Sequence, residues 1–292
     1  GVLAGINLIN TVRGFLAQAE GENNPYAQEC KELAQLVAAP QLAWTPEENG
    51  KTKLSYARTS KYDNLLRYEG YELILKILRY LYQIDAYISI AEVARERGFV
   101  FAEALPLGGN ILEIEGMFHP LIENAIPNSI QADAEHNVVF LTGANMAGKS
   151  TFMKTFGIVV YLAHMGFPLP VKKMRFSVQN GMYTTINLPD NMMLGYSHFY
   201  AEVQRLKKVA EQVGRIGNLV IVFDELFRGT NVKDAHEATL AVMEAFAEKK
   251  NCIFMISTHI IEAGEDLKKR CDNISYVYLP TVMKDGRPTY TY

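Results

Sequence analysis

Hydrophobic residues recur every three or four positions along the first third of the chain, a spacing that predicts helices. Residues 1–40 carry two such stripes, and residues 61–97 carry a longer one that only Gly70 interrupts. The segment between them, residues 39–60, contains proline, glycine and scattered charges, and we interpret it as an exposed linker or hairpin. The pattern therefore predicts an α-helical domain over residues 1–106.

After residue 106 the pattern changes to short runs of aliphatic and β-branched residues that alternate with helical stretches. Such alternation is typical of a mainly parallel sheet with flanking helices. We therefore predict an α/β domain over residues 107–292, preceded by the helical domain. The expected strands are Ile111–Ile114, Val138–Leu141, Leu219–Phe223, Cys252–Ile256 and Ile274–Leu279.

The composition is that of an ordinary packed protein, with 49% hydrophobic and 21% charged residues among 292. A net charge of −3 provides no overall basic field, which counts against the chain alone being a strong nucleic-acid binder. Its three cysteines show no metal-ligand spacing, so we expect buried thiols in a reducing compartment, the cytoplasm. The most apolar stretch, residues 155–171, is interrupted by glycine and two prolines, so no membrane span is expected.

A glycine-containing loop joins the strand Val138–Leu141 to a following helix. Glycines permit a turn that aims several backbone N–H groups at one point, and the helix N-terminus adds its positive dipole end there. We expect a phosphate group at this point, with Lys149 on the β- and γ-phosphates and the Ser150 hydroxyl on Mg²⁺. The alternative, a glycine turn with a surface lysine, does not explain the flanking strand and helix. The expected nucleotide contacts are Gly143, Ala144, Asn145, Met146, Ala147, Gly148, Lys149, Ser150 and Thr151.

A second buried run, Leu219–Phe223, ends in Asp224 and Glu225. Because a phosphate-bound metal needs a carboxylate at the end of another buried strand, Asp224 is expected to join Ser150 on the magnesium ion. Glu225 is then expected to orient or deprotonate the attacking water. The alternative is an acidic strand end that a helix N-terminus satisfies.

His259 follows a third predicted strand, Cys252–Ile256. A lone histidine at a strand end is usually structural. Here it comes to the carboxyl edge of the sheet, where ligands bind in α/β proteins, and we interpret it as a sensor of the γ-phosphate. A basic cluster at Lys172, Lys173 and Arg175 is instead interpreted as a solvated loop rather than a DNA contact.

Taken together, these motifs resemble the ATPase domain of the MutS family of DNA mismatch-repair proteins. Asn145-Met146 resembles the family's pair between the loop glycines, Asp224-Glu225 followed by residues 228–230 resembles its Walker B and D-loop, and Thr258-His259 resembles its switch histidine. The resemblance covers about residues 80–285. It implies an ABC-type P-loop NTPase fold with ATP and Mg²⁺ as cofactors and catalytic roles for Lys149, Glu225 and His259.

The stretch Asp190–Glu202 resembles the family's signature loop. By that resemblance Ser197 would reach across a homodimer to the partner's nucleotide, and DNA would be a partner, contacted through regions partly absent from this chain. Residues 1–106 would be a partial helical core or lever region of a longer protein. The chain departs from the family pattern at Ala144, Ala147 and Tyr196, which bear on signalling between subunits more than on the phosphate chemistry.

Two functions follow as hypotheses. The first is an ATP-hydrolysing, DNA-associated domain that drives conformational changes of a DNA clamp from a dimer interface. The alternative is a nucleotide-binding regulatory or interaction module with negligible hydrolysis, in a MutS-like protein without mismatch recognition. Glu225 favours turnover, because a switch can dispense with the base. A generic kinase or transferase is disfavoured by the Ser197 loop, and the sequence leaves open which DNA structure is the target.

Overall fold

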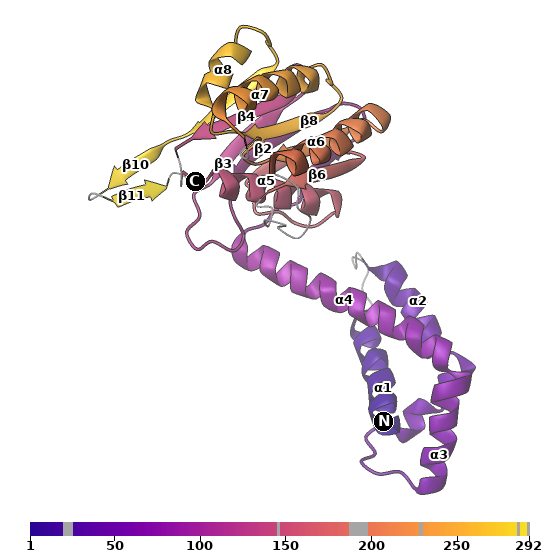
Figure 1. Cartoon of the computed structure of the whole chain (residues 1–292). Helices are drawn as coiled ribbons and strands as arrows, with labels where there is room; N and C mark the ends of the chain where they lie inside the picture. Colours follow the sequence, from indigo (N-terminus) through magenta and orange to yellow (C-terminus); the bar gives the residue numbers. More distant parts are fainter. Residues whose placement is uncertain (20–25, 145–146, 187–197, 228–229, 285–286, 291–292) are drawn as a thin grey trace. The chain divides into compact units, whose positions relative to one another are not determined.

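The structure is a computed structural model that describes residues 1–19, 26–144, 147–186, 198–227, 230–284 and 287–290 (Figure 1). The chain divides into two compact units, Gly1–Glu92 and Val93–Tyr292. Within the described ranges, no helix is both long enough and apolar enough to cross a membrane.

The first unit is helical, and its core is one apolar cluster. The predicted long helix over residues 61–97 is in fact two helices, joined by a π-helical turn at Leu65–Glu69. That turn ends at Gly70, whose N–H donates to Leu65 O at 2.7 Å, so the interruption predicted at Gly70 is a real break. The helices of this unit are α1 (Val2–Ala19), α2 (Ala27–Val37), α3 (Tyr56–Asn64) and α4 (Tyr71–Arg97), the last of which continues past the unit's boundary.

The segment at residues 39–60 is exposed at most of its positions, as its composition predicts, but part of it has regular structure. It contains two 3₁₀ turns, Pro40–Leu42 and Thr45–Glu48, and the side chains of Leu42 and Thr45 are fully buried. The buried Glu48 carboxylate accepts a hydrogen bond from Tyr62 Oη at 2.6 Å. A few inward-facing side chains, with a satisfied carboxylate among them, therefore hold an otherwise exposed segment against the helical unit.

The second unit is built on a five-stranded sheet in which all neighbours are parallel, in the order β6-β7-β8-β4-β9. This confirms the predicted α/β class with a mainly parallel sheet. Strands β7 and β9 have the bounds that the sequence predicts, and β4 and β8 differ by one or two residues. The bounds are β4 (Val138–Gly143), β6 (Gly181–Thr185), β7 (Leu219–Phe223), β8 (Ile253–Ser257) and β9 (Ile274–Leu279).

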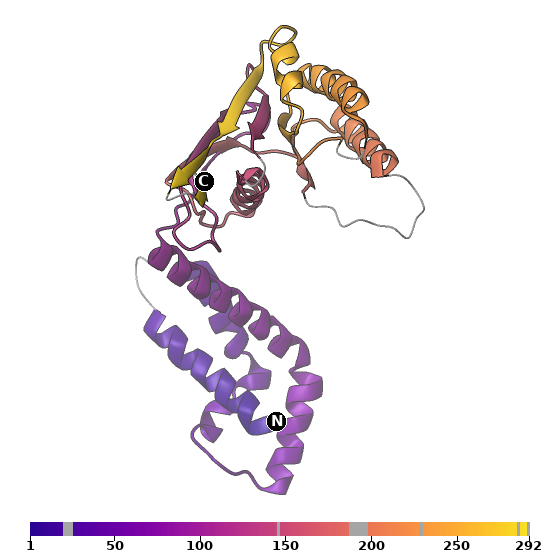
Figure 2. The same ribbon diagram turned by 60° about the vertical axis from the view of Figure 1, so that its left-hand side comes forward.

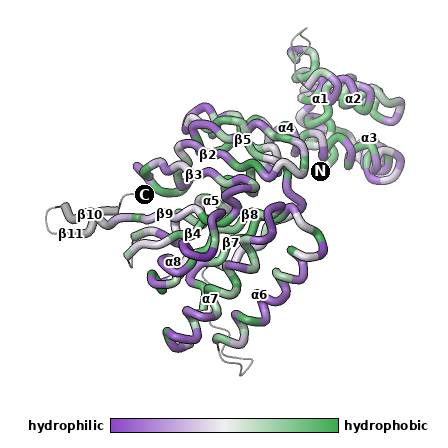
Figure 3. Tube along the Cα trace, turned by 90° about the horizontal axis from the view of Figure 1, so that it is seen from above, coloured by the Kyte–Doolittle hydropathy of each residue, from purple (hydrophilic) through white to green (hydrophobic). Residues whose placement is uncertain are grey.

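Alternate residues of the central strands enter two different apolar cores, as side chains of a strand point to opposite faces. On β4, Val139 and Leu141 pack with α5, whereas Val138 and Phe140 pack with the helices on the other face. Figure 2 shows the orange helices α6 and α7 together, apart from α5. Figure 3 shows purple and green stretches alternating along α6, as expected for a helix with one buried face. The helices are α5 (Lys149–His164), α6 (His198–Arg215), α7 (Val232–Ala247) and α8 (Ile261–Leu267).

A second sheet packs against the α5 face; the predicted strand Ile111–Ile114 overlaps its strand β2, but the separate sheet was not predicted. Its order is β1-β5-β2-β3, and only the β1–β5 pair is parallel. Two further strands, β10 (Thr281–Lys284) and β11 (Arg287–Tyr290), form an antiparallel hairpin. The bounds of the second sheet are β1 (Glu103–Leu105), β2 (Leu112–Met117), β3 (Asn128–Ala132) and β5 (Lys173–Ser177).

The basic cluster interpreted as a loop therefore lies mostly on strand β5. Met174 and Phe176 are almost fully buried between the charged positions, so the true pattern is the alternation of a half-buried strand. Arg175 donates two hydrogen bonds to Glu113, and Lys172 pairs with Glu115. These acidic partners on β2 offset part of the positive charge of the cluster.

Candidate functional site

The carboxyl ends of β4, β8 and β7 meet at one edge of the main sheet. Leu141 of β4 pairs with Ser257, the last residue of β8, and Phe223, the last residue of β7, pairs with Ile256. Because neighbouring strands lie about 4.8 Å apart and β4 runs about three residues further than β7, the segments that follow these three strands begin within about 15 Å of one another. The phosphate loop, the acidic pair and His259 are those segments, so the edge brings together most of the residues selected from the sequence.

The phosphate loop leaves β4 through a glycine that has no room for a side chain. A Cβ built on Gly143 would lie 2.7 Å from Leu279 O of β9. Ala147 N donates to Ala144 O at 3.0 Å and its methyl group is buried, which closes the turn. Gly148 then has a φ of 90°, a conformation that L side chains rarely adopt, and it directly precedes α5. The loop therefore delivers the chain to a helix N-terminus, where backbone N–H groups have no intrahelical partner.

Lys149 is the first residue of α5, and it is only 5% exposed. Its Nζ donates to Gly143 O at 2.8 Å and to Ala144 O at 3.2 Å. These two carbonyls use two of the three ammonium donors, so the charge is held over the loop with one further donor for an anion. The geometry is that of a fixed cation at the mouth of a helix N-terminus, not the surface lysine of the alternative interpretation.

Ser150 and Thr151 are half-buried in the first turn of α5. A hydroxyl oxygen at Ser150 and a carboxylate at Asp224 form the kind of hard-oxygen donor set that Mg²⁺ prefers. In the described part of the chain, no group of three or more His, Cys, Asp or Glu side chains could hold a metal ion.

The acidic pair is held between the two strands that flank β7. Asp224 N donates to Thr185 O of β6 at 3.0 Å, and Asp224 Oδ1 accepts a hydrogen bond from Ser257 Oγ of β8 at 2.7 Å. The same Ser257 oxygen accepts from Glu225 N at 2.8 Å. Both acids are half-buried. Their carboxylates therefore come from a backbone that neighbouring strands fix on both sides, as a metal ligand or general base requires.

Glu225 and His259 face each other across the gap between β7 and β8. Glu225 Oε1 lies 2.7 Å from His259 Nε2, and their side chains are 24% and 40% exposed. The residues predicted as base and as γ-phosphate sensor thus contact each other directly. A histidine that donates to a carboxylate fixes the orientation of both groups, so each controls where the other points.

Three of the predicted site residues lie outside the described residues: Asn145, Met146 and Ser197. Their expected nucleotide contacts stay predictions. The residues of the signature loop that are described, Phe199 and Glu202, belong to α6, and Phe199 packs 5.8 Å from the Phe227 ring.

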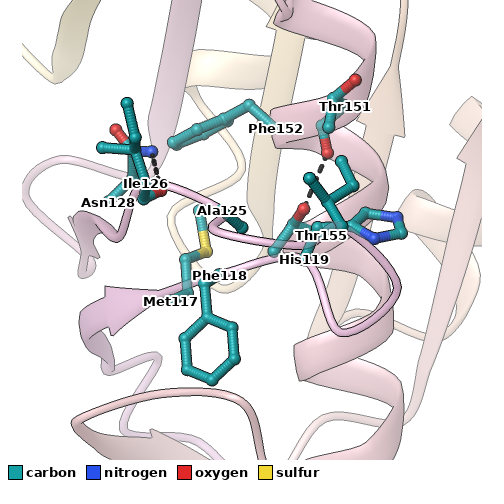
Figure 4. A pocket seen from close by; sticks show the side chains of 10 residues that line it. Met117, Phe118, His119, Ala125, Ile126, Asn128, Thr151, Phe152 and Thr155 are labelled. Atoms are coloured by element: carbon teal, nitrogen blue, oxygen red, sulfur yellow. Dashed lines mark hydrogen bonds between the residues drawn. The ribbon is translucent and has the colours of Figure 1, made fainter. Parts of the chain in front are cut away.

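The structure also reveals a pocket beside the phosphate loop that sequence reasoning did not assign. Figure 4 shows the α5 residues Thr151, Phe152 and Thr155 facing the loop that follows β2, with His119 close to Thr155. Asn128 and Thr155 form local hydrogen bonds to Ile126 O and Thr151 O. The segment that carries His119 lies far from α5 in sequence, and the fold brings it against that helix. The lining is Met117, Phe118, His119, Ile122, Ala125, Ile126, Asn128, Thr151, Phe152 and Thr155.

His119 is neutral by the chemistry of its surroundings. Its Nδ1 accepts a hydrogen bond from Leu121 N at 3.2 Å, which a protonated Nδ1 could not do. Burial lowers the pKa of His119, and the nearby Lys154 ammonium lowers it further. The pocket therefore offers an uncharged ring and apolar side chains beside the helix N-terminus.

We expect His119 to make the protein less stable at acid pH. Because its folded-state pKa is lowered, the unfolded chain takes up the proton first, and stability falls as the pH drops below the unfolded value of about 6.5. Urea unfolding between pH 8 and pH 5 should show a larger loss for the parent chain than for His119→Asn, whose amide oxygen can still accept from Leu121 N. Parallel losses in the two proteins would contradict this assignment.

The strand, loop and helix, with an acidic pair after β7 two strands away, define an α/β protein with a mainly parallel sheet. The family model for MutS domain V matches residues 139–292, slightly more than half of the chain. The chain therefore belongs to the MutS family.

Individual proteins similar to this chain point to the same family as the family model. The chain is 29% identical over 214 residues to the DNA mismatch repair protein MutS of Lactococcus lactis subsp. cremoris, covering 71% of this chain and 25% of that protein. It is 31% identical over 194 residues to MutS of Thermus aquaticus, covering 65% and 23%. The match to MutS of Aquifex pyrophilus, 27% identical over 306 residues, covers 95% of this chain and 35% of that protein. The chain thus spans about a quarter to a third of the length of these relatives.

Proposed function

We propose that residues 107–292 form a P-loop ATPase domain of the ABC type that binds Mg·ATP and hydrolyses it. The observation that carries this proposal is the convergence of Lys149, Asp224, Glu225 and His259 at one sheet edge. Membership of the family to which the DNA mismatch repair relatives belong supports ATP as the ligand. The bound magnesium ion would neutralise phosphate charge and polarise the transferred phosphoryl group.

Each residue of this edge has a separate role in the proposal. Lys149, held over the loop by two carbonyls, contacts the β- and γ-phosphates, while backbone N–H groups from Gly143 to Thr151 surround them. Ser150 and Asp224 hold the metal. Glu225 takes the proton of the attacking water, and its contact with His259 keeps the carboxylate aimed while the histidine reports on the γ-phosphate.

We further propose that the pocket beside α5 receives the base of the nucleotide. A nucleotide whose phosphates sit at the N-terminus of α5 has its base within reach of the first two turns of that helix, and Thr151, Phe152 and Thr155 of those turns line the pocket. The neutral ring of His119 and the apolar side chains suit a flat heteroaromatic group. This assigns the base contacts that the sequence left open.

The proposal extends to the assembly and partners of the chain. We propose a homodimer in which Ser197 completes the partner's nucleotide site, with DNA as the macromolecular partner and the cytoplasm as the location. Residues 1–106 would act as the helical core or lever region that carries movement from the ATPase domain toward DNA. The DNA mismatch repair proteins MutS named above motivate the choice of DNA.

The dimer proposal is tested by mixing two inactive variants. Lys149→Ala removes the phosphate contact and Ser197→Ala removes the group supplied to the partner, so each alone should be nearly inactive. A one-to-one mixture should regain about a quarter of the parent's ATPase rate, because half of the dimers are mixed and each has one intact site. Phosphate release is measured at high protein concentration with ATP and Mg²⁺.

A rate per chain that is independent of protein concentration, without recovery on mixing, would rule out the shared site. Binding of Mg·ATP by the parent chain with no phosphate release under any of these conditions would rule out the ATPase itself. That second result would favour the nucleotide-binding regulatory module.

A further inference from the structure

The last residue of β8, Ser257, joins the two candidate catalytic acids through a single hydroxyl group. Its side chain is fully buried, although a serine at a strand end is commonly exposed to water. Its Oγ donates to Asp224 Oδ1 at 2.7 Å and accepts from Glu225 N at 2.8 Å. A serine hydroxyl has one hydrogen, so acceptance from Glu225 N leaves that hydrogen for Asp224. The two bonds form a chain that runs from the backbone of one acid to the carboxylate of the other.

The backbone that Ser257 holds is in an unfavourable conformation. Glu225 has a φ of 56° and Phe227 a φ of 61°, in the left-handed region that residues with a side chain rarely enter. Such a conformation is unfavourable for a residue with a side chain, so this turn needs interactions that hold it in place. Ser257 provides two of them, because its carbonyl oxygen also accepts from Leu226 N at 3.0 Å. Phe227, which is buried, anchors the far end of the turn.

The same hydroxyl controls the carboxylate of Asp224. One oxygen, Oδ1, is committed to Ser257, so the carboxylate is held in one orientation and presents Oδ2 for a further ligand. A metal ligand that is oriented in this way by a neighbouring hydrogen bond binds better than a freely rotating one, and such outer contacts are typically worth 10–100-fold in metal affinity or activity.

We propose that Ser257 is a positioning residue for the ATPase reaction: it orients Asp224 as a single-oxygen metal ligand and locks the turn that aims Glu225 at His259. This inference rests on the proposed function, since it concerns the same metal and the same water. It adds a residue on β8 that touches neither nucleotide nor metal but sets the geometry of both acids.

The proposed role of Ser257 concerns the two acids and not the phosphate contacts. Lys149 is held by the carbonyl oxygens of Gly143 and Ala144, whereas the side-chain hydrogen bonds of Ser257 to described residues go to Asp224 and Glu225. Loss of the hydroxyl should therefore weaken the metal-dependent part of nucleotide binding and the chemical step, and leave metal-free binding of the phosphates intact. A hydroxyl that only satisfied a buried N–H would lower stability without separating these quantities.

The test compares Ser257→Ala with Ser257→Thr, which keeps the hydroxyl, and with Thr239→Val. Thr239 is a matched control, because it is also fully buried and its Oγ1 donates to Ala235 O within α7, away from the sheet edge. Each variant of the 292-residue chain is titrated with ADP in EDTA and with ADP at increasing Mg²⁺, and its kcat and KM for ATP are measured. Thermal unfolding accompanies every preparation.

We expect Ser257→Ala to raise the half-saturating Mg²⁺ concentration about tenfold and to lower kcat about tenfold. Its affinity for ADP in EDTA should change less than about twofold, since the phosphate loop keeps its own contacts. Ser257→Thr should recover most of the loss, and Thr239→Val should match the parent in all three quantities. If Ser257→Thr does not fold, the comparison of Ser257→Ala with Thr239→Val still tests the proposal.

The proposal is overturned if Ser257→Ala leaves the Mg²⁺ dependence and kcat like those of Thr239→Val, or if it weakens ADP binding equally with and without metal. Hydrogen exchange of the Glu225 and Leu226 amides separates this from failure of the proposed function. If the parent chain shows no Mg²⁺-dependent nucleotide binding, the ATPase and metal roles fail together. Faster exchange in Ser257→Ala alone would then retain Ser257 as the lock of the turn, and unchanged exchange would remove that role too.

Discussion

Lys149→Ala is expected to abolish ATP binding, whereas Glu225→Gln is expected to bind ATP normally and to hydrolyse it very slowly. The lysine is buried at the start of α5 and contacts phosphate charge in the ground state, where each hydrogen bond to a charged group is worth about 1.5–3 kcal/mol. The glutamate acts only on the water in the chemical step, so its loss should lower kcat about 10²–10⁴-fold. Equilibrium binding of a fluorescent ATP analogue and single-turnover phosphate release measure the two effects separately.

Two exposed residues of the same types provide controls. Lys269→Ala and Glu265→Gln remove one positive and one negative charge at exposed ion pairs in and next to α8, remote from the phosphate loop. Both should match the parent, because exposed ion pairs contribute little. Equal loss of ATP binding in Lys149→Ala and Glu225→Gln would refute the division of roles between ground-state contact and chemistry.

Gly143→Ala is expected to destabilise the ATPase domain and to weaken nucleotide binding together. The added methyl group would lie 2.7 Å from Leu279 O and 3.3 Å from Leu279 Cβ, so β9 or the loop must move. Overpacking of this kind costs about 1–3 kcal/mol. Because the displaced atoms include Gly143 O, which accepts from Lys149 Nζ, the ammonium should lose its position as well. Thermal unfolding and ATP binding are the measurements.

Gly157→Ala is the matched control for Gly143→Ala. Gly157 lies within α5, and a Cβ built there meets no atom within 4 Å. Alanine is favoured over glycine inside a helix by about 1 kcal/mol, so this variant should be as stable as the parent or more stable, with unchanged nucleotide binding. If the two glycine variants show the same thermal stability and the same nucleotide binding, the close approach of β9 to the loop does not affect either quantity.

The parts of the fold that could be predicted are those in which local pattern and burial agree. Strand β7 is five consecutive apolar residues followed by two acids, and strand β9 is similarly apolar, so both were located to the residue. Strand β5 was mistaken for a loop because only Met174 and Phe176 carry its alternation, between Lys173 and Arg175. Two inward residues are too short a signal to separate a strand from a basic turn.

Some residues of the candidate site could be predicted from local sequence patterns, and others could not. The spacing of the glycine-containing loop is enough to predict Lys149 as a site residue. An acidic pair at a strand end is enough to predict Asp224 and Glu225. The pocket at His119 and the role of Ser257 depend on contacts between segments distant in sequence, for which neither residue has a local signature. A serine at the end of a strand, two residues before a histidine, gives no sign that its hydroxyl will be buried against two carboxylate-bearing residues.

The position of β4 between β8 and β9 determines when the site can form. Val138 pairs with Phe254 on one side and with Ile274 on the other. Both partners of β4 are therefore synthesised more than 100 residues after it. Pairing over such separations is slow, because a long loop must close before the contacts stabilise it. During synthesis the hydrogen-bonding edge of β4 that pairs with β8 therefore stays open until residue 257 has left the ribosome, and the edge that pairs with β9 until residue 279 has left it. The proposed nucleotide site, in which Gly143 lies against Leu279, would then form only after β9 is in place.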